Sequence, residues 1–83
     1  MNDQPTPYRE LADVIARLPL LLREARRARG LSMRAAAKEL GMSFSTVYRM
    51  EEGNDCALSN AVAVLRWLDQ TAARPARPAE EAS

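Results

Sequence analysis

The 83-residue chain contains no histidine, one cysteine (Cys56), three glycines and four aromatic residues. A single thiol cannot close a disulfide within the chain, which favours a reducing compartment. No apolar run approaches the roughly 18 residues of a membrane span, and residues 1–8 lack the apolar core of a secretory signal. With no histidine, paired-acid cleft, metal-ligand cluster or phosphate-binding glycine loop, the chain has no arrangement typical of an active site. These absences predict a cytoplasmic, non-enzymatic protein without cofactor, metal or membrane association.

The net charge of +1 conceals a separation of charge along the chain. Residues 1–18 carry −1, residues 19–50 carry +5 and residues 51–83 carry −3 at neutral pH. The middle block is therefore the one plausible surface for a polyanion such as nucleic acid. A solvated helical face would have a similar composition, so charge alone does not decide between the two.

Apolar residues recur at helical spacing, and prolines, glycines and serines mark the segment ends. Pro19 predicts a break after Leu18, because proline is disfavoured inside a helix but accepted in its first turn. Gly30 is suited to end the following helix. We predict a flexible arm over residues 1–7, one helical domain over 8–72, and a disordered tail over 73–83. The predicted helices cover residues 8–18, 19–29, 33–40, 44–52 and about 59–71, of which the first lies outside a core over 19–72.

Residues 31–53, LSMRAAAKELGMSFSTVYRMEEG, have the pattern of two short helices joined by a glycine turn. The spacing of four residues is the one that a helix-turn-helix requires. They are a small residue where the helices cross, the turn glycine and two apolar residues on the inner face of the second helix. Serines before each helix can cap the free amides of its first turn. The residues concerned are Ala37, Gly41, Val47 and Met50, with Ser32 and Ser43 as caps.

Through LLREARRARGLS, AKELGMS and STVYRMEEG, residues 20–69 resemble the Cro/cI-type helix-turn-helix domain of the XRE family of bacterial and phage regulators. The resemblance implies an all-α, compact bundle of four to five short helices that binds operator DNA as a dimer. It also implies an ion pair between Arg26 and Glu51. In the family the helix over 44–52 enters the major groove. This places Phe44, Ser45, Tyr48 and Arg49 as candidate base-reading residues, and Arg34, Lys38, Ser43, Thr46 and Asn54 as candidate phosphate contacts.

Arg49 is the strongest candidate for base recognition, because a guanidinium pairs with two acceptors of guanine. Phe44 departs from the polar residue common in the family, and it has two interpretations. It contacts a thymine methyl group, or it packs against the start of the helix over 33–40. Met33 and the loop over 54–57 lack phosphate contacts that the family often has, which makes dimerisation more important for affinity.

The helix over 59–71 carries two sets of apolar residues. We predict that Ala61, Val62, Leu65 and Leu68 form its core stripe, which leaves Trp67 on an offset face. Trp67 then packs on the helix over 8–18 or anchors a dimer, and the first arrangement is favoured because that helix also needs an apolar partner.

Together these features predict a sequence-specific regulator that binds double-stranded DNA, a phage or bacterial repressor acting as a homodimer at an operator near the nucleoid. The alternative is an antitoxin or another protein-binding module of the same fold, which would neutralise a partner protein through its N-terminal helix or its tail.

Overall fold

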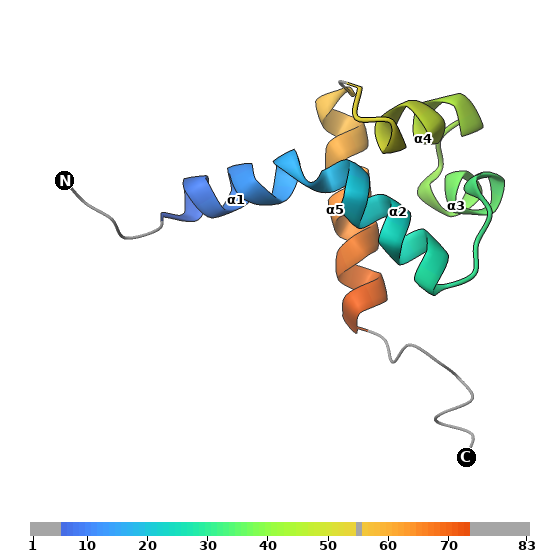
Figure 1. The fold of residues 1–83 in the computed structure, drawn as a ribbon, viewed down its shortest axis with the longest axis horizontal. Coiled ribbons are helices and arrows are strands. Elements are labelled where there is room, and N and C mark those ends of the chain that lie inside the picture. Colours follow the sequence, from blue (N-terminus) through green and yellow to red (C-terminus); the bar gives the residue numbers. More distant parts are fainter. Residues whose placement is uncertain (1–5, 55, 74–83) are drawn as a thin grey trace, which may run out of the picture.

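The computed structural model describes residues 6–54 and 56–73, and this part of the chain forms five α-helices without a strand (Figure 1). The predicted all-α fold is therefore confirmed. Helices α2 to α5 pack together, whereas α1 projects away from them. No helix of the described ranges is long and apolar enough to cross a bilayer. The predicted tail, except for its first residue, and most of the predicted arm lie outside the described residues. The helices are α1 (Pro7–Ala16), α2 (Leu18–Ala28), α3 (Met33–Leu40), α4 (Phe44–Glu51) and α5 (Leu58–Ala73).

The hydrophobic core lies between α2, α3, α4 and α5. Leu22, Val47 and Val64 are completely buried at its centre and come from three different helices. Removing such a side chain from water contributes about 1.5–3 kcal/mol to stability. Around them lie Leu18, Ala37, Met50, Ala61 and Trp67, with half-buried residues such as Leu31, Met33, Leu40, Met42 and Cys56 packed against the cluster.

A single residue, Arg17, separates α1 from α2. It ends α1 and precedes the first residue of α2, with a backbone conformation (φ −97°, ψ 5°) outside both helices. The break falls one residue earlier than Pro19 alone predicts. The reason is that proline is tolerated throughout the first turn, where its missing N–H has no helical partner, so α2 begins at Leu18.

The core stripe of α5 differs from the predicted one. Ala61, Val64 and Trp67 are buried, whereas Val62 is exposed. Trp67 belongs to the core, where its indole N–H donates a 2.9 Å hydrogen bond to Glu39 of α3. The prediction that Trp67 packs on the N-terminal helix was therefore wrong. A buried tryptophan needs a partner for its N–H, and α3 supplies that partner.

Candidate nucleic-acid interface

The turn between α3 and α4 depends on Gly41. This residue adopts a left-handed conformation with φ +72°, which side chains disfavour and glycine accepts. The amide of Met42 then donates to the carbonyl of Ala37 at 3.0 Å, which closes the end of α3. The chain can therefore reverse within three residues and begin α4 at Phe44.

Hydroxyl caps begin both helices of the motif. Ser32 accepts a 3.0 Å hydrogen bond from the amide of Ala35, and Ser43 accepts one of 3.1 Å from the amide of Thr46. Each bond satisfies an amide in the first turn that has no partner within the helix. Both helices consequently start where the serines predict.

The inner face of α4 is held against the core. Val47 and Met50 are buried there, and Ala37 of α3 is buried where the two helices meet. The small side chain of Ala37 lets the helices approach closely. Because these residues fix the inner face, the remaining face of α4 points outward.

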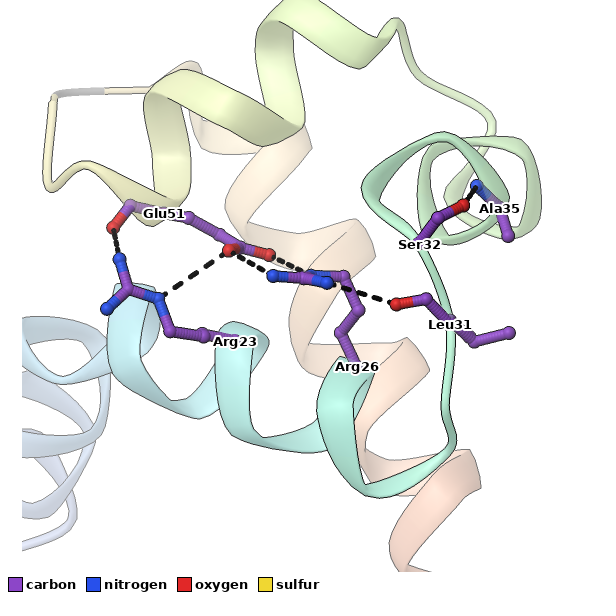
Figure 2. A network of polar contacts seen from close by, with 6 residues as sticks. All are labelled: Arg23, Arg26, Leu31, Ser32, Ala35 and Glu51. Carbon is purple, nitrogen blue, oxygen red and sulfur yellow. Dashed lines mark hydrogen bonds and ion pairs between the residues drawn. The ribbon is translucent and has the colours of Figure 1, made fainter.

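A buried ion-pair network fixes the end of α4 to α2 (Figure 2). Glu51 has a side chain only 1% exposed and receives two hydrogen bonds from Arg26, at 2.7 and 3.0 Å. Arg26 also donates to the backbone carbonyl of Leu31 at 3.0 Å. These side-chain hydrogen bonds to Glu51 raise the pKa of the Arg26 guanidinium above its ordinary value. The pair implied by the sequence resemblance is thus present as a bidentate contact, and it connects three segments.

Arg23 extends this network, and the sequence reasoning missed it. Its guanidinium donates to the backbone carbonyl of Glu51 at 3.2 Å and lies 3.7 Å from the Glu51 carboxylate. The available signal was its position three residues before Arg26, since residues three apart share a helix face. Figure 2 shows both arginines directed towards Glu51.

A second network joins α2, α3 and α5. Arg29 makes a bidentate ion pair with Glu39, at 2.7 and 3.2 Å, and its guanidinium lies 5.8 Å from the ring centroid of Trp67. Glu39 also accepts the indole hydrogen bond described above. Nothing in the local sequence indicates that Arg29 and Glu39 meet, because the contact depends on how the helices cross. Arg23, Arg26 and Arg29 are thus engaged by acids, so part of the basic block serves the fold.

The outward face of α4 carries the candidate base-reading residues. Ser45, Tyr48 and Arg49 are exposed there. Phe44 is 38% exposed and stacks on Tyr48, with ring centroids 6.4 Å apart. The Arg34 guanidinium, from the first turn of α3, lies 4.6 Å from the Phe44 ring centroid. Both interpretations of Phe44 are therefore compatible with its position: it contacts the start of α3, and it keeps part of its ring exposed.

The candidate phosphate contacts come from α3, from α4 and from the residues that flank α4. Arg34, Lys38, Ser43 and Asn54 are exposed, and Thr46 is half-buried. The hydroxyls of Ser43 and Thr46 lie 2.9 Å apart and share a hydrogen bond. Arg34 and Lys38 form no salt bridge with the described residues, and their charges are available to a ligand.

Comparison with known proteins gives one match. A family model described as a helix-turn-helix domain matches residues 17–77, well over half of the chain. Neither the curated proteins nor the solved structures give a significant match. The match includes α3, the Gly41 turn and α4, and it supports DNA binding as the class of function. The chain belongs to the helix-turn-helix domain family.

Proposed function

We propose that this chain is a sequence-specific regulator of the Cro/cI type, a phage or bacterial repressor that binds an operator in double-stranded DNA as a homodimer. The observation that carries the proposal is the exposed outer face of α4, whose inner face is fixed by the core and by the Arg26–Glu51 pair. A helix held so rigidly can enter the major groove without first becoming ordered. In this role the protein occupies its site and performs no chemistry.

Arg49 is proposed as the main base-reading residue. Its guanidinium is exposed and forms no salt bridge with the described residues, so its donors are available to the O6 and N7 atoms of guanine. A bidentate contact of this kind contributes about 1–3 kcal/mol to discrimination between bases. Ser45 and Tyr48 lie on the same exposed face and add hydrogen-bonding groups.

Phe44 is proposed to contact the methyl group of a thymine. Arg34 and Tyr48 lie against its ring and restrict its movement, while its exposed part remains available for an apolar contact in the groove. Arg34 is thereby held near the same position and can reach a phosphate.

The phosphate contacts are proposed to come from Arg34, Lys38, Ser43, Thr46 and Asn54. The two basic residues attract the DNA backbone regardless of sequence. The neutral residues contribute hydrogen bonds that fix the position of α4 in the groove. The affinity should therefore fall as salt concentration rises.

The test is selection of duplexes from a random library, followed by binding measurements on the enriched sequence and on a scrambled one. We expect Arg49→Ala to reduce the preference for the enriched sequence by about 1–3 kcal/mol, roughly five- to 150-fold. Arg9→Ala is the matched control, since Arg9 lies on α1, remote from α4. No enrichment by the unaltered protein, or equal losses in both variants, would contradict the proposal.

A second candidate function is binding of a partner protein, as in an antitoxin. The observation that favours it is α1, an amphipathic helix with no buried residue. A toxin-like reading frame adjacent to the gene, and a stable complex between the two products, would support this function. It is compatible with DNA binding because α1 and α4 are separate surfaces.

A further inference from the structure

The apolar face of α1 is only partly covered within the described chain, where Ile15 lines a second groove beside Met50 and Leu58. Tyr8 and Leu11 are 82% and 49% exposed, Ile15 is also exposed, and no residue of the helix is buried. These three residues lie on one side of the helix, and Arg9 lies on the opposite side. A helix of ten residues is marginal in water without tertiary contacts. Its apolar face therefore requires a surface to cover it.

The same chain has an open apolar groove of about 740 Å³ between α2 and α5. Leu21 and Ala25 line it from α2, and Leu65 and Leu68 line it from α5. Val14 of α1 lies at its margin, so the apolar surface of α1 continues into the groove. The apolar face of α1 and the groove are therefore neighbouring parts of one continuous apolar surface.

The described helices do not cover this surface. A single residue, Arg17, connects α1 to α2, and α1 points away from the packed helices, so only Val14 reaches the groove (Figure 1). Residues 74–83, RPARPAEEAS, have no apolar side chain larger than those of alanine and proline. Such a segment cannot fill a groove walled by leucines.

We propose that a second copy of this chain covers the surface: α1 of each protomer lies in the α2–α5 groove of the other, around a twofold axis. The inference rests on the homodimer of the proposed function and identifies its interface. Both complementary surfaces occur in one chain, and a twofold exchange satisfies both at once.

The area of such an exchange reaches the size of a small specific interface. A large side chain buries roughly 100 Å² of apolar surface. Tyr8, Leu11 and Ile15 are 82%, 49% and 39% exposed, and with the groove residues that they cover they would bury roughly 500 Å² in each contact. Because a twofold interface contains every contact twice, the total reaches roughly 1,000 Å², the size that a specific protein–protein interface must reach. One α1 in a foreign groove would bury half of this area.

The test is the molar mass in solution, by sedimentation equilibrium over a wide range of protein concentrations. The unaltered protein should dimerise. Leu11→Glu on α1 and Leu21→Lys in the groove should each raise the dimer dissociation constant by at least about tenfold, or about 1.4 kcal/mol. Arg9→Gln changes the charge by the same amount as Leu11→Glu on the opposite face, and it should have no effect. Circular dichroism verifies that each variant remains helical.

Mixing the two interface variants separates the exchange from simpler pairings. In the mixed dimer, the unaltered α1 of the Leu21→Lys chain meets the unaltered groove of the Leu11→Glu chain. In the other contact the new glutamate faces the new lysine, so the charges attract. Mixing should therefore restore dimers. If Leu21→Lys remains as dimeric as the unaltered protein, α1 pairs without the groove and the inference is wrong. It is also wrong if the unaltered protein is monomeric, if Leu11→Glu remains dimeric, or if mixing restores no dimers.

Because Leu11 is exposed, its variant remains informative even if Leu21→Lys fails to fold. DNA binding on the same samples distinguishes this inference from the proposed function. A monomer that binds its enriched duplex specifically overturns the exchange and the proposed homodimer but leaves sequence-specific binding intact, and α1 is then available to a different protein. A dimer that binds every duplex equally overturns the sequence-specific function and leaves the exchange intact.

Discussion

Helices α4 and α1 are both short, amphipathic and capped by a hydroxyl side chain, but the rest of the molecule holds them differently. Ser43 caps α4 and Thr6 caps α1 through equivalent hydrogen bonds of 3.1 and 3.0 Å. Beyond its cap, α4 has three buried residues, Val47, Met50 and Glu51, whereas α1 has none. Local signals are therefore sufficient to place both helices in the sequence, but tertiary contacts fix only α4.

This difference suits the two proposed roles. A helix that reads bases must present its side chains in a fixed geometry, because hydrogen bonds to base edges depend on position. A helix that docks into another protomer can remain exposed until the partner provides its core. On these proposals, the chain separates a rigid base-reading helix, α4, from a helix, α1, whose order depends on association.

The largest expected effect comes from breaking the network that fixes α4. Glu51→Ala would leave Arg26 partly buried without its carboxylate, and removing one partner of a buried pair costs about 3–5 kcal/mol. We expect the urea midpoint of unfolding to fall accordingly. For a domain of this size, such a loss removes much of the total stability.

The neighbouring residue Glu52 provides the control. It is exposed and follows the last residue of α4, where a negative charge opposes the helix dipole. Glu52→Ala should change the free energy of unfolding by less than about 0.5 kcal/mol. Equal effects of the two substitutions would mean that the buried pair does not hold α4.

Leu22 and Leu11 allow a direct comparison of the core with α1. Leu22 is completely buried, and its substitution by alanine should cost about 2–5 kcal/mol. Leu11→Ala removes the same atoms from an exposed site, so in dilute solution it should cost less than about 0.5 kcal/mol. Both values come from denaturant unfolding followed by circular dichroism.

The concentration dependence sharpens this comparison. If α1 docks into a second copy, the cost of Leu11→Ala should increase with protein concentration, because association stabilises the folded state. The cost of Leu22→Ala in dilute solution already reflects the core of one chain. A large effect of Leu11→Ala in dilute solution would show that α1 is fixed within the monomer.

Much of the helix-turn-helix motif was predictable because its signals are local. Ser32 and Ser43 mark helix starts through their side-chain hydroxyls, and Gly41 marks a helix end through its backbone conformation. Ala37 and Val47 have spacings that place them on facing sides of adjacent helices. Each of these signals depends on residues close together in the chain, so it can be recognised from the sequence without knowledge of tertiary contacts.

The contacts of α5 and α1 could not be predicted in the same way. Helical spacing defines two apolar stripes on α5 but does not say which one meets the core. The choice depends on how α5 crosses the other helices, and the hydrogen bond from Trp67 to Glu39, which joins residues 28 positions apart, is one contact of that crossing. Similarly, an amphipathic pattern identifies α1 without showing whether its partner lies within the same chain. Long-range geometry decides both questions.

The last comparison is between equivalent caps in the two regions, with an expected effect of about 1 kcal/mol on the domain. Ser32→Ala removes a hydroxyl that caps α3, and because α3 is part of the cooperative core, the whole domain should lose about 1 kcal/mol. Thr6→Ala removes the equivalent hydrogen bond from α1. In dilute solution it should reduce the helical content of α1 while the unfolding midpoint remains unchanged, because opening of α1 is not coupled to the core.

Hydrogen exchange of individual amides measures both effects: Ser32→Ala should accelerate exchange throughout α2 to α5, and Thr6→Ala should accelerate it in α1 alone. If Thr6→Ala lowers the unfolding midpoint as much as Ser32→Ala does, α1 unfolds together with the core. The distinction between a fixed α4 and a locally stabilised α1 is then wrong.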